Sequence, residues 1–385
     1  MTDDKYTDWE QYERASEPHK RERAEYWRTA IGLQQVDGLQ VSNYLRQTAE
    51  QHIEGDITID EARERIKTYY ITKTSHDNSG GEEEADKVAA NIAKLLAEPS
   101  FSFTANEMLN IHRHIFTGVF KHAGQIRTYD ITKKEWVLRG DTVMYGRAAD
   151  IRMALEYDIE QERSFSYKGL SADDIVRHLA QFVSLLWQNH PFCEGNTRAT
   201  ALFFIKYVRS LGFQADNTLF ANNSWYFRNA LVRANYRNVA KGIEADDTFL
   251  IRFLRNLLFG EHHELRNRFM LVNPPEEWTE QDKHNTSTIQ AQYKYNTSCT
   301  IEVSETIQPL LLAIGLGECS VKEIMTAMAL KARANFLNTY LTPAIEQGLV
   351  RMRYPDNPRH PRQKYLLSVK GLAWYNERRQ KHQIK

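Results

Sequence analysis

The chain has few cysteines and no long apolar stretch. Its three cysteines, Cys193, Cys299 and Cys319, are odd in number among 385 residues and follow no disulfide spacing, which is typical of a reduced cytosol. No apolar run approaches the ~20 residues that a membrane helix needs, and the first residues are too polar for a signal peptide. We therefore expect a cytoplasmic protein without a membrane segment.

A net charge is also missing, because fifty acidic side chains balance fifty basic ones. The field of the whole protein therefore argues neither for nor against nucleic acid, and any polynucleotide contact must be local. Apolar residues make up 42% of the chain, which is enough for buried cores, and a chain of 385 residues usually forms two or three domains.

The most informative stretch is His-Pro-Phe-Cys-Glu-Gly-Asn-Thr-Arg, residues 190–198. Apolar residues recur at helical spacing before it, from Ile175 to Leu186, and after it, from Ala201 to Val208, until Gly212. The pattern predicts a loop that joins two buried helices.

Such a loop suits a nucleotide phosphate. The first N–H groups of the second helix lack intrahelical partners and, with the helix dipole, favour a bound anion. Gly195 lets the chain approach a phosphate closely, and Arg198 can fork two hydrogen bonds onto its oxygens. Glu194 is placed to hold a magnesium ion that bridges phosphates, and His190 is free to take a proton from a hydroxyl.

These residues resemble the signature of the Fic (filamentation induced by cAMP) proteins, H-x-F-x-[D/E]-G-N-G-R-x-x-R. The chain departs from it at Thr197, where the family has glycine, and at Ala201, where the family usually has a second arginine. Residues 124–145, with the Arg139-Gly140-Asp141 turn, are similar to that family's target-binding flap. With the helical pattern of residues 103–257, the resemblance covers about half of the chain.

The resemblance implies a mainly α fold, a Fic-type helical bundle with a β-hairpin flap, in a catalytic domain at residues 85–262. It implies a protein adenylyltransferase that moves AMP from ATP, with Mg²⁺, onto a hydroxyl of a target protein. His190 would be the general base and Glu194 the metal ligand. The nucleotide contacts would be Gly195, Asn196, Thr197, Arg198 and Tyr226. The flap would pair with an extended target segment through its main chain, at Ile131, Thr132, Lys133, Val143, Met144 and Tyr145.

Residues 1–72 look like the small helical antitoxins that partner Fic toxins, here fused to the enzyme. Those antitoxins carry [S/T]-x-x-x-E-[G/N], whose Glu pairs with the second Arg of the signature. The corresponding place here reads Leu33-x-x-x-Asp37-Gly38, and the second Arg is Ala201. Our hypothesis is that Asp37 and Gly38 mark an inhibitory segment that still docks but no longer clamps the site by that salt bridge.

After a polar linker at residues 263–300, residues 301–385 resemble a winged-helix domain. Helical runs at 307–316, 321–328 and 335–347 precede two strands, 349–354 and 363–368, joined by a proline-rich loop. Residues 350–385 hold ten Lys or Arg against two acids, a net charge of +8. Such a wing suits DNA phosphates. It equally suits protein contacts or homodimerisation, since a fold does not fix a function.

Two alternatives to AMP transfer stay open. Thr197 and Ala201 also fit a Fic variant that uses another donor or removes AMP. The basic C-terminal domain fits a DNA-binding regulator whose Fic site is vestigial. A nucleophilic role for Cys193 is disfavoured, because it occupies a variable position of the signature, and His112 and His114 point to different faces of one helix and cannot easily share a metal.

Overall fold

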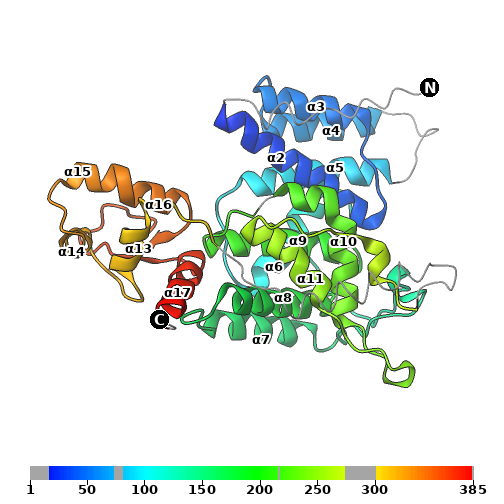
Figure 1. Cartoon of the computed structure of the whole chain (residues 1–385). Helices are drawn as coiled ribbons and strands as arrows, with labels where there is room; N and C mark the ends of the chain where they lie inside the picture. Colours follow the sequence, from blue (N-terminus) through cyan, green and yellow to red (C-terminus); the bar gives the residue numbers. More distant parts are fainter. Residues whose placement is uncertain (1–16, 73–80, 216, 274–300, 384–385) are drawn as a thin grey trace.

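The computed structural model describes residues 17–72, 81–215, 217–273 and 301–383. It is mainly helical, as the sequence predicts, and within these residues the only sheet is one two-stranded ladder. None of the helices described is long and apolar enough to cross a membrane. Figure 1 shows a helical body with a smaller C-terminal domain beside it.

The N-terminal segment forms a layer of helices over one face of the body (Figure 1). Its contact with the body is close, because a Cβ added at Gly32 would lie 2.3 Å from the backbone of Ala221. The Ser42 hydroxyl caps one helix and donates to the buried Asp86 carboxylate at 2.5 Å. The segment contains α2 (Pro18–Gly32), the 3₁₀ turn η1 (Leu33–Asp37), α3 (Asn43–Glu54) and α4 (Ile59–Thr72).

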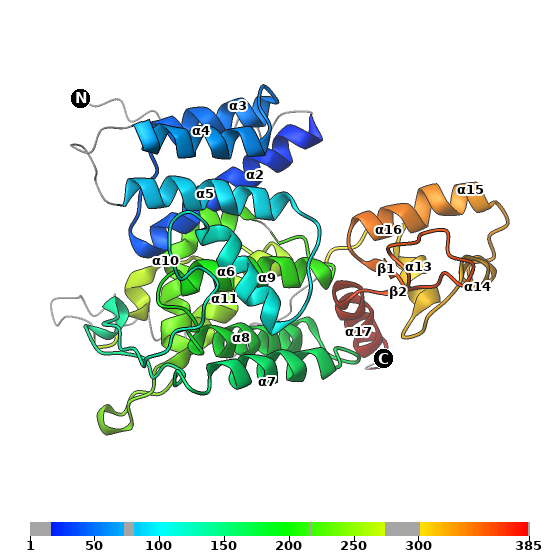
Figure 2. The ribbon, with the colours of Figure 1, turned by 180° about the vertical axis from the view of Figure 1, so that it is seen from behind.

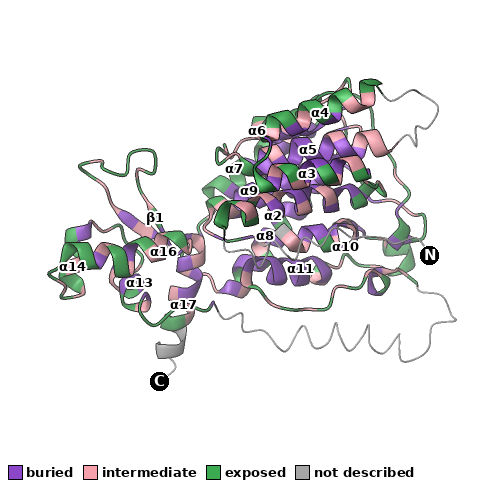
Figure 3. Cartoon of the chain, turned by 90° about the horizontal axis from the view of Figure 1, so that it is seen from above, coloured by how far each residue is buried: buried purple, intermediate pink, exposed green. Residues whose placement is uncertain are grey.

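The body is a bundle around two consecutive buried helices, α8 (Ala172–Gln188) and α9 (Asn196–Ser210). Ser171 and Asp174 begin α8 with a reciprocal capping box. Every residue of α9 from Asn196 to Val208 is buried, and Figure 3 shows buried residues gathered in the interior of the helical body. The surrounding helices are α5 (Glu82–Ala97), α6 (Ala105–Phe116), α7 (Ile151–Ser164), α10 (Asn217–Asn235) and α11 (Thr248–Phe259).

The predicted β-hairpin flap is wrong in its detail. Residues 131–145 lie within the described chain but form no strand; instead a 3₁₀ turn, η2 (Trp136–Leu138), precedes the left-handed Arg139 and Gly140. Main-chain bonds close this turn, among them those from Glu135 N to Asp141 O at 2.9 Å and from Gly140 N to Glu135 O at 3.0 Å. The predicted turn is therefore present, but no ladder of strands continues from it. Two further 3₁₀ turns, η3 (Val239–Lys241) and η4 (Asn267–Met270), follow later in the chain.

The C-terminal domain has the predicted order of helices and strands. Its antiparallel ladder pairs Val350 with Leu367 and Met352 with Tyr365. The predicted third helix, however, is interrupted by a π-helical turn, and α17 after the second strand was not predicted. The elements are α13 (Gln308–Ile314), α14 (Val321–Ala327), α15 (Arg333–Phe336), η5 (Leu337–Leu341), α16 (Thr342–Glu346), β1 (Val350–Met352), β2 (Tyr365–Leu367) and α17 (Val369–Gln383).

The C-terminal domain contacts the far end of α9, and Figure 2 shows α17 at this boundary. Gly212 and Gly348 allow the two backbones to touch, because a Cβ on Gly348 would lie 2.0 Å from the Gly212 carbonyl oxygen. Val369 N donates to Leu211 O at 3.1 Å, and Asn376 donates to Leu170 O at 3.1 Å. The two domains therefore share main-chain contacts.

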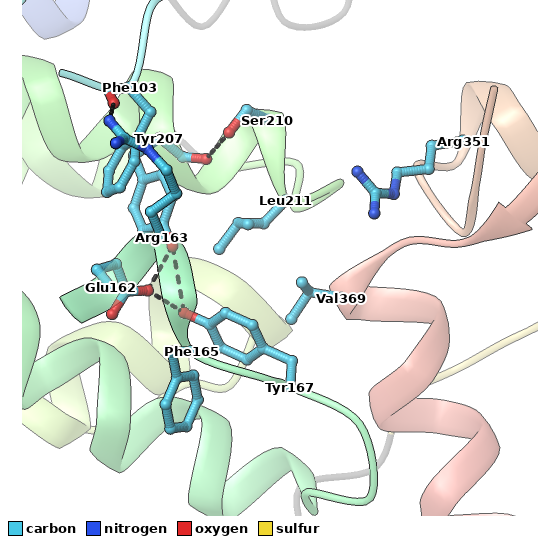
Figure 4. Close-up of a pocket in the computed structure, with 10 residues that line it drawn as sticks. All are labelled: Phe103, Glu162, Arg163, Phe165, Tyr167, Tyr207, Ser210, Leu211, Arg351 and Val369. Carbon is cyan, nitrogen blue, oxygen red and sulfur yellow. Dashed lines mark hydrogen bonds between the residues drawn. The ribbon is translucent and has the colours of Figure 1, made fainter. Parts of the chain in front are cut away.

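A cavity of about 250 Å³ lies at the same boundary (Figure 4). Its carboxylate, Glu162, is buried and accepts hydrogen bonds from the hydroxyls of Tyr167 and Tyr207. His178 Nε2 lies 2.6 Å from the second oxygen of Glu162. These neighbours satisfy the carboxylate, so the cavity needs no ligand to explain it.

The N-terminal segment contains a histidine whose charge state affects stability. The Trp27 indole donates to Nδ1 of His52 at 2.9 Å, and burial, with Arg23 nearby, lowers the pKa of His52 to about 4. The unfolded chain, with a pKa of about 6.5, binds this proton first. The contribution of His52 to stability is therefore complete above about pH 6.5 and declines towards pH 4.

We expect the thermal midpoint of the wild type to fall more steeply between pH 7 and pH 4.5 than that of His52→Asn, which keeps an acceptor for the Trp27 indole but does not titrate. Differential scanning calorimetry at several pH values measures this difference. Equal slopes in the two proteins would contradict the assignment.

Candidate functional site

The loop at residues 190–195 connects α8 to α9, as predicted. Gly195 is the residue before α9 and has φ +72°, and a Cβ there would lie 2.1 Å from the ring of Phe116. Only glycine combines this backbone angle with this contact. Asn196 then closes the loop, since its side-chain amide accepts from Phe192 N at 2.8 Å and donates to Phe192 O at 2.7 Å.

The first turn of α9 can receive an anion. Residues 196–198 begin the helix, so their N–H groups have no intrahelical acceptor, and the helix dipole adds positive potential there. Thr197 is helical, and its hydroxyl accepts from the Trp187 indole at 2.9 Å. The Thr197 side chain therefore ties α9 to α8, which leaves only its N–H group for a nucleotide.

His190 is buried directly before the loop, with φ +46°. Its Nδ1 lies 3.3 Å from Trp187 O, a contact in which Nδ1–H donates and Nε2 keeps its lone pair. Burial lowers the pKa of His190 well below its usual range, and Lys133 acts in the same direction. The imidazole is therefore neutral at pH 7 and able to accept a proton. The Tyr145 ring packs against it, 4.2 Å between centroids.

Arg127 joins His190 to both ends of the flap. Its side chain is fully buried and donates to the carbonyls of His190, at 2.8 Å, of Tyr129, at 2.6 Å, and of Gly146. The Arg127 guanidinium therefore links the backbone of the flap to the backbone of His190.

Glu194 has the exposure that a metal ligand needs. Its side chain is 60% exposed, and Lys133 of the flap lies 3.8 Å from it. Among the described residues, no group of three or more His, Cys, Asp or Glu side chains could hold a metal alone. Glu194 would therefore supply one carboxylate ligand, and a bound Mg²⁺ would need its other ligands from phosphate oxygens and waters.

Arg198 is 2% exposed and is surrounded by three polar side chains. It donates to Gln34 at 3.0 Å and to Glu84 at 2.7 Å, and it forms an ion pair with Asp37 at 2.9 Å. We call Gln34, Asp37, Glu84 and Arg198 the Arg198 cluster. The N-terminal segment therefore does pair with the anion loop. The salt bridge to position 201 is absent, as the hypothesis expects, but Asp37 forms a different one, to Arg198, which was not anticipated from the sequence.

Two positions named in the sequence analysis are buried. Position 201, where the signature usually has a second arginine, is an alanine that is fully buried inside α9. Tyr226 is 1% exposed, and its hydroxyl donates to Phe249 O at 3.3 Å within the core. Tyr226 is therefore part of the core in this arrangement, and its contact with a nucleotide stays a prediction.

The flap residues divide by exposure. Val143 and Tyr145 are buried, Ile131 and Lys133 are partly buried, Thr132 is exposed, and Met144 is 84% exposed. The Tyr145 hydroxyl donates to Glu135 at 2.8 Å. Part of the flap is thus an anchor, and of the six predicted target-binding residues Thr132 and Met144 are exposed to solvent.

Four residues that shape this site were not assigned a role in it from the sequence: Gln34, Glu84, His112 and Arg127. Arg127 stands within the flap-like motif and could have been selected on that ground. The other three reach the loop from 82, 114 and 164 positions away, and a single sequence carries no signal for such contacts.

Comparisons with known proteins place the loop within a family match. Residues 102–208 match the family model described as Fic/DOC family, and residues 305–368 match the model of the filamentation induced by cAMP protein Fic-like, C-terminal domain. Over 117 residues the chain is 28% identical to protein adenylyltransferase VbhT of Bartonella schoenbuchensis, a match that covers 30% of this chain and 23% of that relative.

Two solved structures are similar at low identity. A Fic family protein from Desulfovibrio desulfuricans G20 is 17% identical, with 90% of this chain and 87% of that chain covered and a TM-score of 0.36. The N-terminal Fic domain of a Bartonella effector protein from Bartonella sp. AR 15-3 is 19% identical, with 50% and 91% covered and a TM-score of 0.37.

We expect Gly195→Ala to destabilise the protein far more than Gly242→Ala, although both glycines have positive φ. The left-handed angle costs about 1–2 kcal/mol in each, and collision with Phe116 adds about 1–3 kcal/mol at Gly195. A Cβ at Gly242 meets nothing within 4 Å. Urea unfolding of both variants measures the difference, and equal losses would contradict the role of Phe116.

Proposed function

We propose that this chain, which carries a Fic/DOC family domain at residues 102–208, is a protein adenylyltransferase that transfers AMP from ATP to a hydroxyl of a target protein. The observation that carries the proposal is a buried, neutral His190 beside a left-handed glycine and a helix start with free N–H groups. This arrangement combines a base with an anion site within one short loop.

In the proposed reaction, His190 accepts the proton of the target hydroxyl through Nε2 while the hydroxyl oxygen bonds to the α-phosphorus of ATP. The bond between the α-phosphorus and the oxygen that bridges to the β-phosphate breaks, and pyrophosphate leaves. The N–H groups of residues 196–198 would hold the phosphates, and Glu194 would hold a magnesium ion that neutralises their charge. The flap binds the target. Its residue Lys133 lies 3.8 Å from Glu194 and so links the flap to the loop. Arg127 keeps His190 and the flap in register through their carbonyls.

We also propose that the N-terminal segment inhibits this reaction in the arrangement described. Asp37 and Glu84 neutralise Arg198, the cation that would otherwise bind phosphate oxygens. ATP must then displace two carboxylates before Arg198 can bind it. Asp37 lies on η1 and Glu84 on α5. Access of ATP to Arg198 therefore requires movement at both elements.

We expect the wild type with Mg²⁺ and ATP labelled at the α-phosphate to acquire AMP by self-modification. His190→Ala should lose about 10²–10⁴-fold in rate, and Glu194→Ala should also lose most of the reaction. Intact-mass analysis and label counting measure the product. Label retained only from the γ-position would instead support a different transfer.

We expect Asp37→Asn and Glu84→Gln each to raise the labelling rate about tenfold, since a hydrogen bond to a charged group contributes about 1.5–3 kcal/mol. Glu83→Gln is the matched control, because Glu83 lies in the same turn but pairs with Lys87. Unchanged or lower rates in both variants, with normal folding, would contradict inhibition by the Arg198 cluster.

DNA contact by the C-terminal domain is a second candidate function. The loop between β1 and β2 carries exposed Arg359 and Arg362, and Arg351 on β1 is exposed as well. We expect duplex binding that weakens steeply with salt, is lost in Arg359→Glu with Arg362→Glu, and survives in His190→Ala. Fluorescence anisotropy measures it, and no binding at low salt would exclude this function.

A further inference from the structure

His112 lies beneath the anion loop and bonds to it. This residue of α6 is completely buried, and its Nδ1 accepts from Gly124 N at 2.8 Å. A ring nitrogen that accepts carries no proton, so the proton of the neutral imidazole is on Nε2. Nε2 lies 3.0 Å from Glu194 O, to which it therefore donates. Burial lowers the pKa of His112 to about 3, in keeping with this neutral form.

The His112 ring also supports the loop through stacking. It lies parallel to the Phe192 ring, 3.7 Å between centroids, and 4.6 Å from the Phe116 ring. Phe116 in turn fills the space beside Gly195 and lies 4.8 Å from the Arg198 guanidinium. One turn of α6 therefore forms the floor under the loop.

The hydrogen bond to Glu194 O fixes the next peptide group. In a trans peptide the C=O and the following N–H point in opposite directions. Because the Glu194 carbonyl points to His112, the Gly195 N–H of the same peptide group points away from His112. The same bond fixes the backbone that carries the Glu194 side chain.

We propose that His112 is a positioning residue for the phosphate and its magnesium: through Nε2–H it sets the orientation of the Glu194–Gly195 peptide. This inference rests on the proposed function for its consequence in catalysis, but its structural part stands without it. Partners that orient metal ligands typically affect metal affinity or activity by about 10–100-fold.

Three variants separate this role from simple packing. In His112→Gln the amide N–H reaches the place of Nε2–H and can still donate to Glu194 O. In His112→Asn the shorter amide oxygen reaches the place of Nδ1 and can accept from Gly124 N, but the bond to Glu194 is lost. His112→Phe keeps the stacked ring and removes both bonds. His114→Phe is the matched control, because His114 is exposed two residues along the same helix.

We expect His112→Gln to keep most of the AMP transfer rate, and His112→Asn and His112→Phe to lose about 10–100-fold in kcat/KM for ATP. If packing alone mattered, His112→Phe would be near the wild type and the two amides would be equally impaired. That order would overturn the proposal. Thermal midpoints of all variants show whether each one folds, and the Gln and Asn pair decides the question even if the Phe variant unfolds.

Amide hydrogen exchange of peptides covering residues 190–198, measured on the full chain without nucleotide, gives an independent result. We expect at least tenfold faster exchange in His112→Asn and His112→Phe than in His112→Gln or His114→Phe. Equal exchange in all variants would overturn the positioning role. A wild type that transfers no AMP would overturn the proposed function instead, while the exchange order would still decide the role of His112.

Discussion

The contact between Gly195 and Phe116 is the constraint on which the site depends. It requires a residue without a side chain, in a left-handed conformation, at the point where α9 begins. Gly195 sets where α9 begins, and the start of α9 in turn places the free N–H groups and the Arg198 side chain. The burial of α9 on every side then prevents the loop from relaxing, since the helix cannot shift without disturbing the core.

Two buried arginines are the second feature of this site. Arg127 and Arg198 are both almost fully buried, yet their partners differ in kind. Arg127 is held mainly by main-chain carbonyls, which cannot leave, and so it supports the architecture. Arg198 is held by side chains from the N-terminal segment and α5, which can be exchanged for another anion. Main-chain partners thus mark Arg127 as structural, and exchangeable side-chain partners mark Arg198 as able to bind another anion.

The local part of this site could be predicted from the sequence, and the long-range part could not. The loop between two buried helices, the helical state of Thr197 and the turn at Arg139 and Gly140 follow from glycine positions and apolar spacing. The hairpin prediction failed because side-chain contacts such as that from Tyr236 to Asp141, 95 positions apart, replace a ladder. The burial of Tyr226 could not be predicted, because an aromatic residue on an amphipathic helix gives the same pattern in a core as beside a ligand.

The ion pairs of the Arg198 cluster do not depend on protein concentration. Asp37 and Glu84 belong to the same chain as Arg198, so their local concentration is set by the intervening backbone and does not change when the protein is diluted or scarce. Tethered groups of this kind act at effective concentrations on the order of millimolar. A separate inhibitor protein would dissociate at low abundance, whereas under the inhibition proposed above each molecule would carry its inhibitory groups at a fixed ratio of one to one. Release would then depend on the concentration of the competing anion and not on the amount of protein in the cell.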